Sequence, residues 1–233
     1  MPISSPNNEL LKEVRKLTGR RWRDKLSRFV AEGEDLVDAA EAAGWPPVAK
    51  LVAAGSGLDG EEVVPHLLAE HSQLGSGTRV IGLFDQRFAS SLGERCVALW
   101  GVGDPGNVGT VLRAAHAFGA SAVALGPGSA DPFSPKAVRA SMGAIFSVGV
   151  RRVRAVDELP MPRVALVARS GDELSTIGAA ATLIVGAERD GLPEEVLRGC
   201  QQTAHIPIAG DSLNAAMAAT VALYETNRVG RSA

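Results

Sequence analysis

Cysteine, aromatic residues and long apolar runs are all scarce in this chain of 233 residues. Its two cysteines, Cys96 and Cys200, lack metal-ligand spacing, so we expect both to be reduced and buried in a cytoplasmic protein. No apolar run approaches the roughly 20 residues that a membrane-spanning helix needs. The first residues also lack the charged and apolar regions of a secretory signal. The sequence therefore predicts no metal site, no membrane contact and no disulfide framework.

Charge is present but unevenly spread. The net charge is only −2, yet cations are concentrated between positions 12 and 28 and acidic residues directly after them. Such a basic block indicates contact with a polyanion, although a solvated helix face explains the same pattern. The candidate contact residues are Arg15, Lys16, Arg20, Arg21, Arg23 and Arg28.

The chain divides into two patterns of secondary structure. Before residue 90, apolar spacing predicts strands at 29–31, 48–53 and 79–84 and a helix at 61–71. From residue 95 onward, strands are predicted at 97–100, 122–125, 164–168, 183–185 and 205–208, and helices at 108–118, 136–146, 194–200 and 213–227. Near-continuous apolar strands that alternate with helices favour a parallel sheet covered on both faces. We therefore expect an α/β protein with domains at 1–90 and 91–233.

The first candidate site follows the strand predicted to end at Trp100. Residues 101–106 contain the G-x-G-x-x-G spacing of a dinucleotide-binding loop, which would suit a nicotinamide-dependent oxidoreductase. Pro105 removes a backbone donor from that loop, and the next strand ends without the acidic residue that would hold a ribose hydroxyl. Asn107 instead stands where it can cap a helix. Arg113 follows in a small, apolar helix, where it either extends into solvent or meets an anion.

A second candidate site is the loop that follows the strand at 183–185. Gly186 and Gly191 flank Glu188 there, and Pro193 is placed to begin a helix. Glycines on both sides of one carboxylate suit a loop that wraps closely around a ligand. An ordinary strand-to-helix connection with a solvated Glu188 is the alternative.

The third candidate site precedes the alanine-rich C-terminal helix. Ser212, Leu213 and Asn214 follow a Gly-Asp turn and are the first residues of the predicted helix or directly before it. Ser212 is a natural N-cap residue. Asn214 is a mediocre helix residue, so its place in the first turn favours a functional role.

Together, the order and spacing of these motifs resemble those of the SpoU/TrmH RNA 2′-O-ribose methyltransferases of the SPOUT superfamily. The motif residues are Asn107, Arg113 and Gly119; Gly186, Ala187, Glu188, Gly191 and Leu192; and Ile206, Pro207, Ser212, Leu213 and Asn214. The resemblance covers about residues 95–228, and residues 14–33 are similar to a substrate-binding domain often fused in front. It implies a C-terminal trefoil-knotted parallel-sheet methyltransferase domain, a rare exception among unknotted folds, behind a small α/β ribosomal-protein-like RNA-binding domain.

The resemblance also implies a cofactor and residue roles. S-adenosyl-L-methionine would bind mainly to backbone groups, at a site lined by Ala168, Gly186, Ile206, Ile208 and Leu213. Arg113 would activate the ribose hydroxyl, and Asn107, Glu188, Ser212 and Asn214 would orient it and the ribose. Since an arginine is too firmly protonated to act as a base, a phosphate clamp is the other role open to Arg113.

The implied partners are structured RNA, with ribosomal RNA favoured over transfer RNA, and a second copy of the chain in a homodimer. The basic block would then contact RNA, and Trp22 would either stack on a base or pack on a helix. Two features depart from the family pattern: His116 replaces an acidic residue, and the turn at 210–212 is short. A transfer RNA methyltransferase and a non-catalytic RNA-binding protein remain the alternatives.

Overall fold

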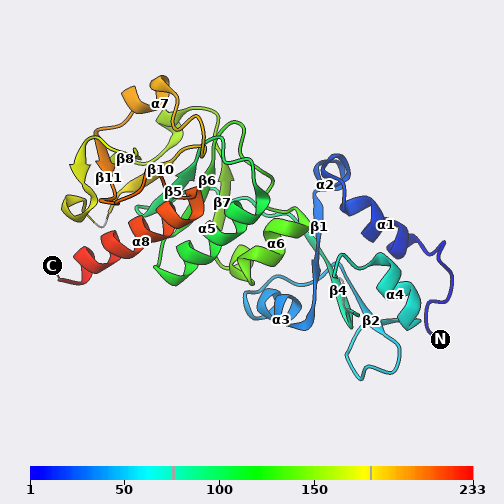
Figure 1. Ribbon diagram of the computed structural model, residues 1–233. Coiled ribbons are helices and arrows are strands. Elements are labelled where there is room, and N and C mark those ends of the chain that lie inside the picture. The colour runs from blue at the N-terminus through cyan, green and yellow to red at the C-terminus, as the bar shows by residue number, and fades with distance from the viewer. Residues whose placement is uncertain (75–76, 179, 233) are drawn as a thin grey trace.

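The computed structural model describes residues 1–74, 77–178 and 180–232, and it contains two β-sheets. Figure 1 shows an elongated molecule with its termini at opposite ends. The N-terminal sheet has the order β1-β4-β2-β3, formed by β1 (Arg28–Glu32), β4 (Val80–Asp85), β2 (Ala49–Ala53) and β3 (Glu61–Val63). Its helices are α1 (Glu9–Leu17), α2 (Arg20–Leu26), α3 (Glu34–Ala42) and α4 (Pro65–His71).

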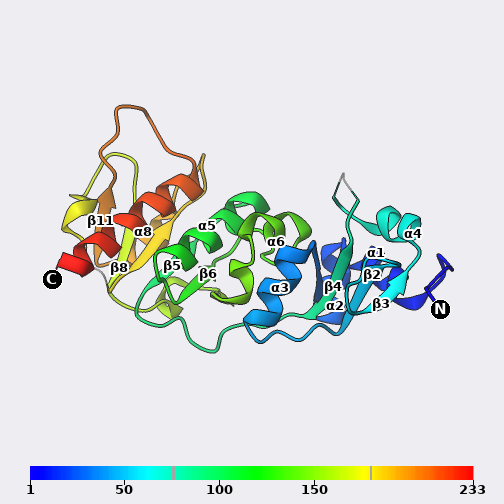
Figure 2. The ribbon, with the colours of Figure 1, turned by 90° about the horizontal axis from the view of Figure 1, so that it is seen from below.

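The C-terminal sheet is entirely parallel and has seven strands in the order β7-β6-β5-β10-β8-β11-β9. These strands are β5 (Cys96–Leu99), β6 (Ala122–Leu125), β7 (Gly149–Arg152), β8 (Arg163–Leu166), β9 (Asp172–Glu173), β10 (Thr182–Val185) and β11 (Gln202–His205). The connecting helices are α5 (Pro105–Ala117), α6 (Pro135–Ser141), α7 (Glu194–Arg198) and α8 (Ala215–Ser232), with short 3-10 turns η1 (Ala144–Phe146), η2 (Val156–Glu158) and η3 (Leu174–Thr176). Figure 2 shows α5, α6 and α8 on one side of the sheet.

The near-continuous apolar runs of the sequence correspond to the four central strands of this sheet, β6, β5, β10 and β8. All residues of β5, β6 and β10 are buried, because helices cover both faces. Thr182 is the one polar residue within those three strands, and its hydroxyl donates to the Pro160 carbonyl at 2.8 Å. Within the described ranges, no helix is both long enough and apolar enough to cross a membrane.

An aromatic cluster joins the two sheets. Phe29 and Phe84 come from the N-terminal sheet, whereas Phe133 and Phe146 come from the segments after β6 and α6. Ring centroids are 4.8 Å apart for Phe29–Phe133 and 5.2 Å apart for Phe84–Phe146. The domain boundary expected at residues 90 and 91 lies in the segment between β4 and β5, but the two units share this buried core. Separating the two units at this boundary would expose the aromatic rings to water.

The structure corrects several expected elements. The helix predicted at 136–146 ends at Ser141, since Met142 and Gly143 adopt positive φ, and residues 144–146 form η1. The helix predicted at 61–71 is wrong in its first part, where 61–63 form β3, because Pro65 fixes the first turn of α4 and Val64 before it is extended. The strand predicted at 205–208 ends at His205, since Pro207 lacks the N–H that a ladder needs. The edge strand β7 was not predicted, because its Arg151 and Arg152 interrupt the apolar pattern.

Candidate active site

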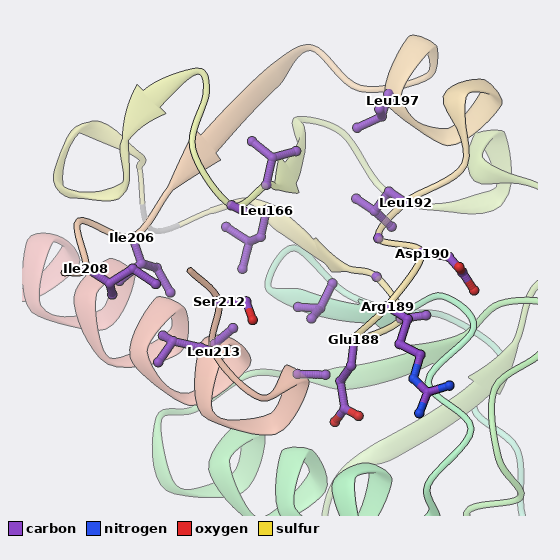
Figure 3. Close-up of a pocket in the computed structure, with 18 residues that line it drawn as sticks. Leu166, Glu188, Arg189, Asp190, Leu192, Leu197, Ile206, Ile208, Ser212 and Leu213 are labelled. Carbon is purple, nitrogen blue, oxygen red and sulfur yellow. The ribbon is translucent and has the colours of Figure 1, made fainter. Parts of the chain in front are cut away.

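A cavity of about 560 Å³ lies at the carboxyl edge of the parallel sheet. Three segments supply most of its lining: 166–168 after β8, 185–192 after β10, and 206–215 between β11 and α8. Leu197 and Ala218 complete it. Figure 3 shows Glu188 and Arg189 at one end of this cavity and Ile206 and Ile208 at the other. Its volume is within the range of small-molecule sites, which occur at strand ends in parallel sheets.

The loop after β10 is held in one shape by its backbone. Ala187 and Gly191 exchange two hydrogen bonds, of 3.1 and 3.0 Å, so that residues 188–190 form the tip of a tight turn. Gly191 has φ +65°, a region that disfavours residues with a Cβ. A Cβ on Gly186 would lie 2.4 Å from the Gly191 backbone. The two glycines predicted to wrap a ligand are therefore required by the turn that presents Glu188.

Three polar residues meet beside the cavity and define what we call the amide–carboxylate cluster: Asn107, Glu188 and Asn214. The side chain of Asn107 donates from Nδ2 to Glu188 Oε1 at 2.6 Å. Asn214 Nδ2 donates to the same oxygen at 2.7 Å and to Asn107 Oδ1 at 3.2 Å. The three expected motifs thus come together at one point, although 107 positions separate the first from the last. Among the contacts within the described residues, Glu188 Oε2 has no hydrogen-bond partner, which leaves an acceptor for a ligand.

Asn214 has a second role as the N-cap of α8. Its Oδ1 accepts from the backbone N–H groups of Ala216 at 2.9 Å and Met217 at 3.3 Å. Its Oδ1 therefore caps the helix, while its Nδ2 donates a hydrogen bond to Glu188. Ser212, expected as a cap or a ribose contact, lines the cavity without capping this helix.

Small side chains bring α8 close to the sheet. Ala215, Ala216, Ala219 and Ala222 are buried, and Ala215 and Ala218 line the cavity. Leu213 points into the same space between Ser212 and α8 (Figure 3). The alanine-rich composition follows from this packing, because larger side chains would push the helix away.

At the start of α5 the structure corrects the expected cap. The helix begins at Pro105 rather than residue 108, and Asp104 caps it by accepting from the Gly106 N–H. Asn107 lies in the first turn, so its side chain is directed to Glu188 instead. Lys136 donates to Asp104 at 3.0 Å, and this contact, together with the Gly106 N–H, lowers the pKa of the Asp104 carboxyl. None of residues 101–106 lines the cavity, which leaves the dinucleotide interpretation without a site there.

The lining fits a ligand with both apolar and polar parts. The five residues expected at the cofactor, Ala168, Gly186, Ile206, Ile208 and Leu213, all lie on the cavity. Most of the lining is aliphatic or backbone, and the charged side chains Glu188, Arg189 and Asp190 are gathered at one loop. No group of three or more His, Cys, Asp or Glu side chains that could hold a metal occurs in the described ranges.

Arg113 is not part of this cavity. It is exposed on α5, and the described part of the chain offers it no hydrogen bond or ion pair. His116, one turn later, is also exposed. A single chain therefore assembles four of the five expected catalytic residues near the cavity and leaves the fifth on the outer face of α5.

The basic block is only partly available to a polyanion. Arg23 was expected to contact a polyanion, but it is buried, with only 3% of its surface exposed. It pairs with Asp131 at 2.8 Å and donates to the Leu17 and Thr18 carbonyls. Arg28 is half-buried between Glu13 and Asp85. The others, Arg15, Lys16, Arg20 and Arg21, are exposed. Trp22 is half-buried and contacts Lys16 and Lys25, with each ammonium about 5 Å from its ring.

Sequence reasoning missed two charged residues at the cavity, Arg189 and Asp190. Both are exposed at the tip of the loop between Gly186 and Gly191 (Figure 3). The signal was present, since the flanking glycines already indicated a tight turn whose tip residues must point outward.

Comparison with known proteins places the chain among RNA methyltransferases. Residues 94–224 match the model of the SpoU rRNA Methylase family. The 23S rRNA (guanosine(2553)-2′-O)-methyltransferase RlmP of Bacillus subtilis is 29% identical, and the match covers 95% of this chain and 97% of that one. The Ribosomal RNA small subunit methyltransferase G 2 of Syntrophobacter fumaroxidans is 33% identical over 98% of this chain, which spans only 49% of that relative's length.

Solved structures of RNA methyltransferases have the same fold as this chain. An AdoMet-bound rRNA methyltransferase from Sinorhizobium meliloti superimposes with a TM-score of 0.87 at 32% identity, covering 98% of this chain and 97% of that one. The similarity confirms the expected fold class, an α/β methyltransferase built on a parallel sheet. The family model also spans all three segments that form the amide–carboxylate cluster. The chain belongs to the SpoU rRNA methylase family.

Proposed function

We propose that the protein transfers the methyl group of S-adenosylmethionine to a ribose 2′-hydroxyl of ribosomal RNA. The observation that carries this proposal is the amide–carboxylate cluster beside the 560 Å³ cavity. The cavity suits a cofactor held by backbone and aliphatic groups, and the cluster supplies polar groups for the sugar. The bound cofactor supplies an electrophilic methyl group on a sulfonium.

The chain's own task is to align the hydroxyl with that methyl group. Asn107 and Asn214 both donate to Glu188 Oε1, which fixes the carboxylate and leaves Oε2 without a partner among the described residues. In this proposal Oε2 accepts the hydrogen bond of a ribose hydroxyl. A carboxylate held by two amides does not turn away when the substrate arrives, so the nucleophile is oriented before the reaction.

Arg113 acts on the RNA rather than as the base. Its guanidinium stays protonated at any ordinary pH, so it binds the phosphate next to the target ribose. Its exposed place on α5, without partners in the described ranges, supports this role because such a guanidinium keeps all its donors for a ligand.

The protein acts as a homodimer in this proposal. Met217, Val221 and Tyr224 form an exposed apolar stripe on α8, at the i, i+4, i+7 spacing of one helix face. Tyr224 contacts Phe118 at the end of α5, the helix that carries Arg113. A second copy covering the stripe would bury this apolar surface and bring a second chain close to the end of α5. A Val221→Glu variant that stays dimeric in sedimentation experiments would contradict this interface.

Large-subunit ribosomal RNA is the proposed substrate, with residues 1–90 contributing affinity for it. The relative matched from end to end acts, by name, on 23S RNA, whereas the small-subunit relative is about twice as long as this chain. The exposed cations Arg15, Lys16, Arg20 and Arg21 support an RNA contact in the N-terminal unit.

The test is to incubate the protein with labelled S-adenosylmethionine and, separately, unmodified 23S, 16S and transfer RNA. Label in 23S RNA alone is the expected result, and label in transfer RNA alone would overturn the substrate assignment. Binding of RNA without any label in the three substrates would favour the non-catalytic alternative. Because the two units share a core, the contribution of residues 1–90 is best tested by exchanging the four exposed cations for Gln rather than by truncation.

A further inference from the structure

An exposed aromatic ring stands beside arginines at the edge of the parallel sheet. Phe88, Ala89, Ser90, Arg151 and Arg152 line a hollow of about 370 Å³, and we call these five residues the Phe88 patch. Phe88 is 45% exposed, whereas Phe29, Phe84, Phe133 and Phe146 are buried and Phe118 is half-buried. All six phenylalanines of the chain lie in the described ranges. A single exposed ring is common on protein surfaces; what distinguishes Phe88 is that it is fixed in place beside two arginines.

The ring is fixed in place rather than loose. The Ala89 N–H donates to the Val150 carbonyl of β7 at 2.8 Å, and Arg151 donates to the Ser90 carbonyl at 2.7 Å. Phe133 meets the ring of Phe88 edge to face, with centroids 5.3 Å apart. The segment that joins the two sheets is thereby tied along the edge strand and holds Phe88 partly in water. A rigid, exposed ring is the arrangement that stacking platforms use.

Arg152 forms ion pairs with Asp24 and Asp131 but no direct hydrogen bond within the described chain, so its N–H groups can still donate to a ligand. Its guanidinium lies over one face of the Phe88 ring, 5.5 Å from the centroid, and 3.6 and 3.7 Å from Asp24 and Asp131; a base would stack on the other face. Neither carboxylate is close enough to accept a hydrogen bond from it, and none is formed with the rest of the described chain. Asp131 is already paired with the buried Arg23 at 2.8 Å. Arg154, two residues on, adds a further exposed cation.

The Phe88 patch lies between the basic block and the cavity. On one side, Asp24 pairs with Arg152 at 3.6 Å and with Arg20 of α2 at 3.6 Å. On the other side, Arg152 is in register with Leu125, Leu125 with Leu99, and Leu99 with Val185, the last residue before Gly186. Three inter-strand spacings of about 4.8 Å put the patch roughly 14 Å along the sheet edge from the cavity.

We propose that the Phe88 patch binds one unpaired nucleotide of the RNA substrate, outside the nucleotide that is methylated. The base stacks on Phe88, and Arg152 and Arg154 contact the phosphate. Single-stranded RNA is held in this way, by aromatic stacking together with guanidinium–phosphate contacts. The inference rests on the proposed function, because it assumes that the chain acts on RNA.

The test compares Phe88→Leu, Phe88→Trp and Arg152→Gln with two controls at exposed sites elsewhere, Met161→Ala and Arg198→Gln. RNA affinity is measured at several salt concentrations, together with KM and kcat of methyl transfer. Phe88→Leu keeps an apolar contact for Phe133 but no stacking face, so RNA binding should weaken about tenfold. Phe88→Trp should restore it.

Arg152→Gln should reduce the slope of log affinity against log salt by about 0.7, whereas Phe88→Leu should leave that slope unchanged. Both should raise KM for RNA more than they lower kcat, with S-adenosylmethionine affinity unaffected. Unchanged RNA affinity in folded Phe88→Leu, with a wild-type enzyme that methylates RNA, would refute the patch and leave the proposed function intact. A wild-type protein that methylates no RNA would instead refute the proposed function.

Discussion

The two roles of Asn214 can be separated by substitution. Ser and Asn cap helices about equally well, whereas Ala does not cap. In Asn214→Ser the hydroxyl can still accept from the first N–H groups of α8, but it is too short to replace the amide that donates to Glu188 at 2.7 Å. Asn214→Ala removes both roles. The pair therefore tests whether Asn214 belongs to the reaction or only to the helix.

The expected stability changes differ between the two variants. Loss of the cap in Asn214→Ala should cost about 1 kcal/mol of unfolding free energy, since the two N–H groups lose their acceptor. For a chain of this size that corresponds to roughly 2–4 °C in melting temperature. Asn214→Ser should stay within about 0.5 kcal/mol of wild type, because the cap remains and the contact to Glu188 is solvent-exposed.

Asn214→Ser and Asn214→Ala should lose methyl-transfer activity to the same extent. Both variants leave Glu188 held by Asn107 alone, and a misplaced reacting group costs up to about 100-fold in rate. Single-turnover transfer of labelled methyl, measured beside thermal unfolding, should show about that loss in each. If Asn214→Ser transferred methyl at close to the wild-type rate, Asn214 would be a helix cap and nothing more.

Three other predictions follow from the structure. Arg113→Ala should abolish methyl transfer while calorimetric binding of S-adenosylmethionine survives, and retained turnover would remove Arg113 from the mechanism. Arg23→Met should destabilise the fold by about 3–5 kcal/mol in urea unfolding, because it strands the Asp131 carboxylate in the core, whereas Arg21→Met should have little effect. Burial raises the pKa of Cys96 to about 12, so this thiol stays protonated and unreactive toward alkylating reagents at pH 8 and reacts only after unfolding; rapid labelling of Cys96 in the native protein would contradict its burial.

Much of the methyltransferase unit could be predicted from sequence because its strands are buried on both faces. The runs at Ala122–Leu125 and Thr182–Val185 have no competing pattern, so their strands were predicted within a residue. The edge strand β7 was missed because it ends in Arg151 and Arg152, of which Arg152 is exposed, so its sequence lacks a continuous apolar run. Local chemistry also misled at α5, where Asp104 rather than Asn107 caps the helix.

What the sequence could not predict at the site are the contacts between residues that lie far apart in the chain. The motifs indicated that Asn107, Glu188 and Asn214 act together, but only the folded chain shows two amides converging on one carboxylate oxygen. Charge alone could not separate the buried Arg23 from its exposed neighbours, because its partner Asp131 is 108 positions away. The exposure of Phe88 could not be predicted either, because it depends on contacts with β7 and Phe133, which are distant in sequence.

The most direct test of the account is to locate the methyl group on RNA that the protein has modified. The account predicts a labelled nucleotide whose ribose carries the methyl, recognised because the adjoining phosphodiester resists alkaline cleavage and the base is unmodified. The Glu188→Gln variant should leave that nucleotide unlabelled while retaining the fold. A methyl group found on a base, or equal labelling by Glu188→Gln, would contradict the assignment of the amide–carboxylate cluster to ribose methylation.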